Sequence, residues 1–226
     1  MEAAAPWEVP RGDWLSQRLF NARFSTPEGN GRFKLTLRYS NPEQFQVSAT
    51  DPLGRSLWSL YVTSSEALLL EHREKRSCSF SDELDLSSLY LGSFPVRNLP
   101  GLLLGRLPAS PFGNAPLWTD EGDGAKRVRF EDEGFRSWSA RLVSAEPEST
   151  QSGAFVLGLT SWTLREASGT LLAELERDGE WWVLADRRQD LELRWKQVVE
   201  EPLAGPVEIP PVPSRYRRGG CLPSPP

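Results

Sequence analysis

Hydrophobic and polar residues alternate along residues 32–39, and the same pattern returns over residues 44–50. The apolar face of these two runs carries Phe33, Leu35, Leu37, Tyr39, Phe45, Val47 and Ala49. Such alternation is typical of antiparallel strands that have one face in a core and the other in water. The Asn41-Pro42 dipeptide between the two runs predicts a hairpin turn.

Further runs extend the sheet that this pattern predicts. Residues 57–62 and 66–72 are apolar on both faces, which suits central strands or strands that are covered on both sides. Strand-like runs then fill much of residues 125–198, where Asp178-Gly179 is a strong two-residue hairpin signal. The apolar face of the last run carries Leu191, Leu193 and Trp195. Together the patterns predict a mostly β protein with one antiparallel sheet of about eleven strands.

The period of two breaks over residues 86–107. Four apolar residues in this insert follow helical spacing instead: Val96, Leu99, Leu102 and Leu103. Because proline is tolerated only in the first turn of a helix, Pro100 places the helix start near Asn98, and Gly105 ends it. A short apolar helix between two blocks of strands is a natural cover for the apolar face of the sheet.

The ends of the chain differ in composition from its middle. Residues 1–12 are rich in Pro and Ala and predict a flexible segment, while residues 13–20 predict a short helical turn that leads into a strand. One folded domain is expected over residues 13–204. Residues 205–226 hold seven prolines and little apolar material after Ile209, so we expect a disordered tail there.

Composition narrows the range of partners. The chain has 226 residues, enough for one substantial core, and a net charge of −5. No block of basic residues stands out along the sequence, so charge gives no reason to expect nucleic acid. No run of 18 apolar residues predicts a membrane-spanning helix.

The sequence offers little reaction chemistry. It lacks GxSxG, GxGxxG and HExxH motifs, and its one histidine, His72, is not placed beside a nucleophile by any motif. Cys78 and Cys221 form no metal-ligand pattern and are interpreted as two unrelated thiols, because pairing is rarely evident from sequence alone. We therefore expect a protein that is not an enzyme and that has no catalytic residues, metal or cofactor.

Because no catalytic motif is present, the shape of the predicted fold is the basis for predicting its function. A curved sheet with a helical cover would enclose a cavity, and apolar cavities take up acyl chains or other hydrophobic ligands. The residues predicted to line it are Phe33, Leu35, Leu37, Phe45, Val47, Leu191, Leu193 and Trp195. The alternative is a closed, well-packed core without a cavity.

Two blocks of the sequence resemble the LolB-like outer-membrane lipoprotein receptor family. The first is YSNPEQFQVSATDPLGRSLWSLYV, residues 39–62, in which a strand ends in an Asp-Pro-Leu-Gly turn. The second is FPVRNLPGLLLGRLPAS, residues 94–110, a Pro-x-x-x-Leu helix that ends in Leu-Gly. Both blocks occur in the family order and at a similar separation, and the resemblance extends weakly over residues 18–200.

The resemblance implies an open β half-barrel capped by helices, like that of the soluble lipoprotein carrier. Such a protein would be a monomer that holds the acyl chains of lipoproteins under a lid formed by Val96, Leu99, Leu102 and Leu103. It would receive them from a soluble periplasmic carrier and deliver them to the outer membrane of a Gram-negative bacterium, without a cofactor. It also implies a membrane-contacting turn at Pro52, Leu53 and Gly54, with Leu53 touching lipid. The alternative for Leu53 is packing against its own sheet.

Departures from the family pattern keep other functions open. The lipid-modified cysteine and the export signal of the family are not present in this sequence, and neither Cys78 nor Cys221 replaces that cysteine by position. A soluble carrier of the same fold is therefore the nearest alternative, although the Asp-Pro-Leu-Gly turn favours the receptor. A carbohydrate or peptide binder is a second alternative, with Trp138, Trp162, Trp181 and Trp182 presenting their rings. An enzyme would require His72 in a cleft beside a carboxylate.

Overall fold

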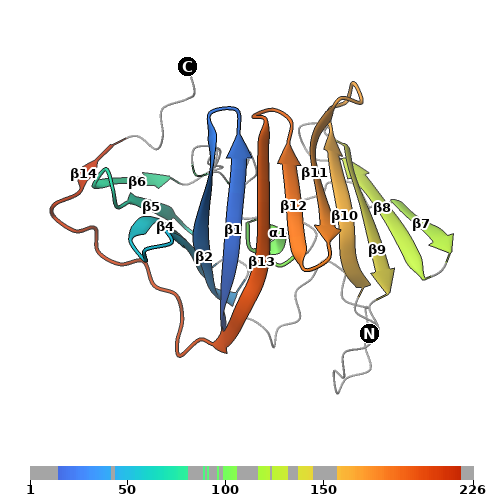
Figure 1. Cartoon of the computed structure of the whole chain (residues 1–226). Coiled ribbons are helices and arrows are strands. Elements are labelled where there is room, and N and C mark those ends of the chain that lie inside the picture. Colours follow the sequence, from blue (N-terminus) through green and yellow to red (C-terminus); the bar gives the residue numbers. More distant parts are fainter. Residues whose placement is uncertain are drawn as a thin grey trace.

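All strands that the structure describes join into one open β-sheet (Figure 1). The computed structural model describes residues 15–41, 44–80, 89, 91, 96, 99–105, 117–122, 124–131, 137–144 and 157–219. The predicted mostly β fold with an open half-barrel is confirmed. The flexible segment predicted for residues 1–12 lies outside the described residues.

The order of elements follows the predicted alternation closely. The strands are β1 (Ser16–Thr26), β2 (Gly29–Asn41), β3 (Gln44–Thr50), β4 (Ser56–Val62), β5 (Ala67–Glu71), β6 (Arg76–Phe80), β7 (Leu117–Gly122), β8 (Ala125–Glu131), β9 (Ser137–Ser144), β10 (Leu157–Arg165), β11 (Leu171–Asp178), β12 (Trp181–Asp186), β13 (Leu191–Pro202) and β14 (Arg217–Arg218). The helix α1 (Leu99–Leu103) lies between β6 and β7 in the sequence. The fourteen strands exceed the predicted number partly because β7 and β14 fall outside the alternating runs.

The sheet consists of two meanders that are joined through the first and last long strands. β1–β6 form one antiparallel meander, β7–β13 form the other, and β1 pairs with β13 between them. β14 extends the first meander by pairing with β6 in parallel. Because β7 and β14 stand at opposite edges, the sheet does not close into a barrel.

β1 begins earlier than the sequence pattern suggests. Ser16 already pairs with Tyr39 in β2 and with Pro202 in β13, so the helical turn predicted for residues 13–20 is wrong from Ser16 onward. Pairing along both edges of β1 outweighs the local sequence preference, as tertiary context often does.

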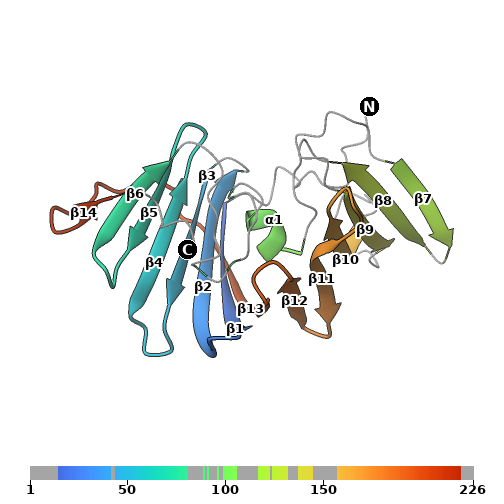
Figure 2. The ribbon, with the colours of Figure 1, turned by 90° about the horizontal axis from the view of Figure 1, so that it is seen from above.

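Register shifts help to bend the sheet around its apolar face. Shifts occur at Leu19/Phe20 in β1 and at Ala49/Thr50 in β3. Such bulges bend a strand and increase its twist. The result is an arch with α1 on its concave side (Figure 2). The buried side chains of β3, including Phe45 and Val47, belong to the core on that side.

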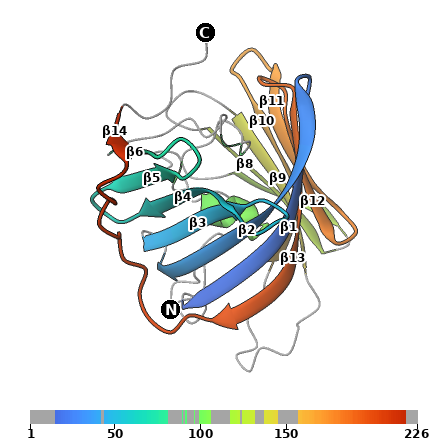
Figure 3. The same ribbon diagram turned by 60° about the vertical axis from the view of Figure 1, so that its left-hand side comes forward.

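The C-terminal strap, residues 203–219, crosses from the end of β13 to β6, the last strand of the first meander (Figure 3). The Val207 N–H donates to Ser40 Oγ over 2.7 Å, and the Gly219 N–H donates to the Ser77 carbonyl over 3.0 Å. Tyr216 packs with Leu68 and Leu70 of β5 on the outer face of the sheet. The disordered tail predicted from residue 205 is therefore wrong through Gly219, and residues 220–226 lie outside the described residues.

The strap also explains why β5 is apolar on both faces. Four consecutive residues, Ala67–Leu70, are buried, two by the main core and two by a smaller cluster under the strap. A proline-rich segment suits this place because proline has no backbone N–H to leave unsatisfied against an apolar surface. The predicted need for cover on both faces is thus met by the tail.

Cys78, in β6, is disulfide-bonded, which corrects the interpretation of two unrelated thiols. The sequence contains one other cysteine, Cys221, two residues after the strap. Spacing gave no sign of this bond because the two positions are far apart in sequence. The pairing of β14 with β6 brings the end of the strap to the strand that contains Cys78.

Candidate functional site

The concave face of the sheet gathers nearly all residues that were predicted to line a cavity. Phe33, Leu35, Leu37, Phe45, Val47, Leu193 and Trp195 are buried members of one core cluster. Leu191 is also buried but lies outside that cluster. The structure therefore brings together the predicted set apart from Leu191. Whether acyl chains enter between these residues stays a prediction.

The predicted lid residues belong to the same cluster. Val96, Leu99, Leu102 and Leu103 are all buried among the side chains of the sheet. The helix is shorter than predicted, at five residues, and its last turn is closed by a hydrogen bond from the Gly105 N–H to the Leu102 carbonyl over 3.1 Å.

Two contacts fix α1 to the sheet. The Trp195 indole N–H of β13 donates to the Leu103 carbonyl over 3.0 Å, which gives a partner to one of the carbonyls that a helix end leaves free. Gly105 adopts a φ of 61° and lies so close to Trp182 of β12 that a Cβ would come within 2.0 Å of its ring. Only glycine fits this close approach with that backbone conformation.

The Asp-Pro-Leu-Gly turn between β3 and β4 is held by one carboxylate. Asp51 Oδ1 accepts hydrogen bonds from the backbone N–H groups of Leu53 and Arg55, each over 2.9 Å. Asp51 Oδ2 pairs with Arg55 Nε at 2.6 Å, and the Gly54 N–H donates to the Asp51 carbonyl. The Arg55 backbone N–H is the main reason that the pKa of Asp51 lies below its ordinary value. Asp, Pro and Gly stand here at the first, second and fourth places that a type I turn prefers.

Leu53 occupies the third place of this turn and projects away from the sheet. Its side chain is 80% exposed, more than any other large apolar side chain that the structure describes. Since the turn is closed by its own hydrogen bonds, Leu53 is not needed to hold it. The structure thus presents an exposed leucine on a hydrogen-bonded turn, with Pro52 and Gly54 also exposed.

The outer face of the sheet carries a basic cluster that sequence analysis missed. We define it as Arg23, Arg32, Lys34, Lys196 and the ring of Trp181, which together line one hollow of about 310 Å³. These residues come from β1, β2, β12 and β13. No basic block appears in the sequence because the cluster arises from strand pairing. The only sequence signal is Arg32 and Lys34 on the wet face of one strand.

His72 lies between two hydroxyl groups. Its Nε2 lies 2.9 Å from Ser59 Oγ and its Nδ1 lies 2.6 Å from the Tyr216 hydroxyl. Burial, together with nearby Arg215, lowers the pKa of His72. Within the described residues, both side-chain partners of His72 are hydroxyls, and no carboxylate pairs with it.

The tryptophan side chains that the structure describes do not form an exposed row. Trp162 and Trp195 are buried in the core, and Trp182 packs against it. Trp181 is half-buried beside Arg23 and Lys196. The side chain of Trp138 lies outside the described residues. Among the described side chains, the tryptophans therefore offer no flat exposed platform of the kind that a carbohydrate binder would present.

Two features are absent from the described part of the chain. Among those residues, no cluster of three or more His, Cys, Asp or Glu side chains is arranged to hold a metal ion. No helix within the same ranges has the length and apolar character needed to span a membrane.

Comparisons with known proteins identify the fold. No protein-family model and no curated protein matches the chain. A LolA superfamily protein from Nitrosomonas europaea is similar with a TM-score of 0.56 at 10% identity, covering 88% of both chains. A putative outer membrane lipoprotein-sorting protein domain from Vibrio parahaemolyticus has a TM-score of 0.50 at 8% identity, covering 84% of this chain and 86% of that one. A DUF1329 family protein from Desulfovibrio piger has a TM-score of 0.52 at 7% identity, covering 86% and 88%.

Identities this low carry information about the fold alone. The chain has a LolA-like fold, which agrees with the half-barrel implied by the two sequence blocks. The narrower resemblance to LolB-like receptors rests on the Asp-Pro-Leu-Gly turn and the helix block.

Proposed function

We propose that this protein binds the acyl chains of lipoproteins against its concave face and delivers them to the outer membrane in the manner of a LolB-like receptor. The LolA-like fold supports the binding of lipoproteins, because one structural neighbour is described as a lipoprotein-sorting domain. The apolar concave face under α1 supplies the surface that acyl chains require. The chemistry is binding alone, without catalysis or a cofactor.

The observation that carries the receptor function is the bare leucine of the turn. Leu53 is 80% exposed on a turn that is closed by the hydrogen bonds of Asp51. A soluble carrier has no need for an apolar tip, whereas a protein that releases cargo into a bilayer gains from brief insertion. One buried leucine contributes only about 1.5–3 kcal/mol, which suits a reversible contact.

The disulfide of Cys78 supports an oxidising compartment, which agrees with the proposed location on the periplasmic side of the outer membrane. Disulfides persist in oxidising compartments such as the bacterial periplasm and are rare in the cytosol. In that compartment the partners would be acylated lipoproteins, a soluble periplasmic carrier that hands them over, and the lipid surface. The protein acts as a monomer in this scheme.

A photoreactive lipopeptide tests the proposal. A triacylated peptide with a diazirine in one acyl chain is titrated against the full chain, irradiated and mapped by mass spectrometry. We expect saturable binding, with cross-links in α1 and on the inward-facing residues of β2 and β3. A water-soluble peptide of the same sequence without acyl chains is the control. Absence of saturable binding, or cross-links confined to the outer face, would overturn the proposal.

A further inference from the structure

Strand register assembles like charges into a row on the outer face. Arg23 of β1 lies directly opposite Arg32 of β2 and also opposite Arg194 of β13. Two residues earlier in β1, Asn21 lies opposite Lys34 of β2 and also opposite Lys196 of β13. Like charges directly opposite each other destabilise a sheet. The row therefore calls for an explanation other than folding.

Most of this charge is not neutralised within the described residues. Arg194 pairs with Glu192 at 2.7 Å, and Lys196 pairs with Glu180 at 3.1 Å. The side chains of Arg23, Arg32 and Lys34 are exposed and form no hydrogen bond or ion pair with any residue in the described ranges. In a chain whose net charge is −5, three neighbouring cations without acidic partners stand out.

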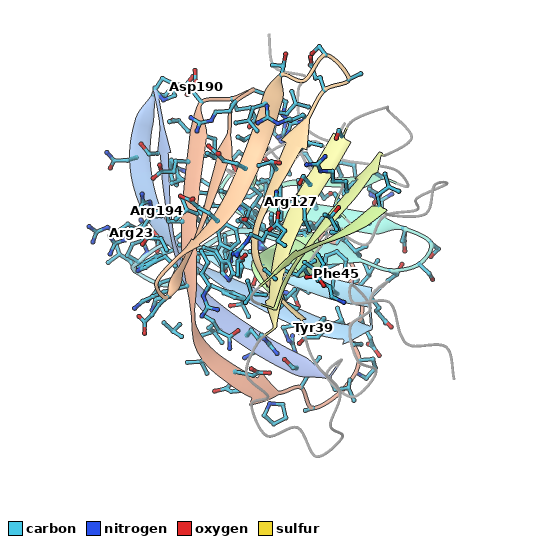
Figure 4. All side chains as sticks on the ribbon, turned by 90° about the vertical axis from the view of Figure 1, so that its right-hand side faces the viewer. Arg23, Tyr39, Phe45, Arg127, Asp190 and Arg194 are labelled. Atoms are coloured by element: carbon cyan, nitrogen blue, oxygen red, sulfur yellow. The ribbon has the colours of Figure 1, made fainter. Side chains whose placement is uncertain are left out.

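An aromatic ring forms one wall of the hollow between these cations. Arg23 Cζ lies 5.0 Å from the centroid of the Trp181 ring, and Lys196 Nζ lies 5.4 Å from it. Figure 4 shows Arg23 and Arg194 projecting on the side of the sheet away from Phe45. The hollow measures about 310 Å³. That volume is at the lower end for ligand pockets and suits a small polar headgroup.

The basic cluster adjoins the turn that carries Leu53. Pro52 contributes to the hollow of the basic cluster and also to a second hollow of about 570 Å³. The second hollow is lined by Leu53 together with two further cations, Arg55 and Arg73. Of the residues lining the two hollows, Asp51 is the one carboxylate, and it is already engaged by the turn.

We propose that the basic cluster binds the phosphate headgroups of anionic lipids while Leu53 enters the apolar layer beside them. Positive charge meets phosphate, an exposed leucine meets hydrocarbon, and tryptophan prefers the interface between the two. The exposed leucine makes a lipid surface a better match than nucleic acid, which offers phosphate without an apolar layer. This inference deepens the proposed function by naming the lipid chemistry at the site of delivery.

Vesicle binding without cargo tests this inference separately from acyl binding. The full chain is mixed with vesicles of phosphatidylcholine alone or with 30% phosphatidylglycerol and then floated through a density gradient. The test variant combines Arg23→Gln, Arg32→Gln and Lys34→Gln. A control variant combines Lys126→Gln, Arg129→Gln and Arg218→Gln, which removes the same charge from exposed positions on β8 and β14.

The parent is expected to bind the anionic vesicles more tightly than the neutral ones, with affinity falling as salt rises. Each cation at an anionic surface contributes about fivefold, so the test variant should bind roughly 100-fold more weakly. The vesicle affinity of the control variant should stay within about threefold of that of the parent, because the cations that it removes lie away from the proposed lipid contact. Lipopeptide binding by the test variant should be unchanged, since the concave face is intact.

Two outcomes would overturn the inference. One is parent binding that does not depend on phosphatidylglycerol, and the other is an equal loss in the test and control variants, which would indicate only a dependence on net charge. An excess of inorganic phosphate should weaken vesicle binding at constant ionic strength, because free phosphate competes with the headgroup phosphates for the same cations. Failure of the lipopeptide to bind would instead count against the proposed function alone.

Discussion

Replacing Leu53 with glutamate separates membrane contact from folding. Leu53 is 80% exposed, and the turn that supports it is closed by hydrogen bonds of Asp51. The folded state therefore loses little packing in Leu53→Glu, and the free energy of unfolding should change by less than about 0.5 kcal/mol. The melting temperature should stay within about two degrees of the parent.

The expected effect on delivery follows from the exposed area that Leu53 offers to lipid. Transfer of a whole leucine side chain from water to an apolar medium is worth about 1.5–3 kcal/mol, and at this exposure most of that value is still available. Glutamate gives up this gain and adds a smaller cost of placing a charge near the interface. If insertion precedes release of the cargo, delivery should slow by about ten- to a hundredfold.

Delivery is measured by loading the protein with a fluorescent triacylated peptide and following its transfer to anionic vesicles. Leu117→Glu is the matched control, because Leu117 is a leucine on the edge strand β7 with a similar exposure of 72%. Leu53→Ile tests whether apolar character alone suffices. Equal delivery rates for the parent and Leu53→Glu would refute membrane contact through this turn. Slower delivery by Leu117→Glu to the same degree would show that any added charge has this effect.

Three other predictions concern the supports of α1 and of the strap. Gly105→Ala should destabilise the fold by about 1–3 kcal/mol more than Gly179→Ala, because both glycines have a φ near 60° but only the Cβ at Gly105 meets a ring; urea unfolding compares them. Trp195→Phe should cost about 1–3 kcal/mol and speed hydrogen exchange in α1, because the Leu103 carbonyl loses its buried donor. The lowered pKa of His72 means that the folded state resists its protonation, so stability should be full above pH 6.5 and fall below it. His72→Gln should flatten urea-unfolding stability between pH 5 and 6.5, and an unchanged slope would contradict this.

The parts of the fold that the sequence predicts are those with a local cause. The alternation around Phe45 and Val47 predicts a strand with one buried face, and both side chains are fully buried. Asp178-Gly179 predicts a two-residue hairpin, and one forms there, although the pairing of Asp178 with Trp181 makes Gly179 and Glu180 its turn residues, one position later than predicted. These patterns work because the pleat and the turn depend on residues that are neighbours in the chain.

The parts that the sequence does not predict depend on distant partners. Ser16 enters a strand because β2 and β13 pair with it from both sides. The strap is ordered because Tyr216 finds Leu68 and Leu70, which lie far away in the sequence. Low hydrophobicity and seven prolines are typical of a disordered tail, and they are equally compatible with a segment that lies along an existing apolar surface.

The residues of the candidate site also differ in whether the sequence alone predicts them. Leu53 is found from sequence because the turn that exposes it occupies consecutive residues. The basic cluster cannot be found from the sequence, because Arg23, Arg32 and Lys196 become neighbours only through the register of three strands. A search of the sequence for basic runs has no means of finding such a group.

The strap gives a reason why membrane contact would stay weak enough to be reversible. Without it, Tyr61, Leu68 and Leu70 on the outer face of β4 and β5 would join Leu53 as apolar surface. Each further side chain of this kind contributes about 1.5–3 kcal/mol in lipid, so such a surface would hold the protein at the bilayer. With the strap in place, the apolar contact offered by this part of the molecule is reduced to one leucine beside the basic cluster. The strap thus covers apolar surface on one side of the turn, and the exposed cations of the basic cluster lie on the other. This arrangement favours a reversible contact between the protein and a membrane.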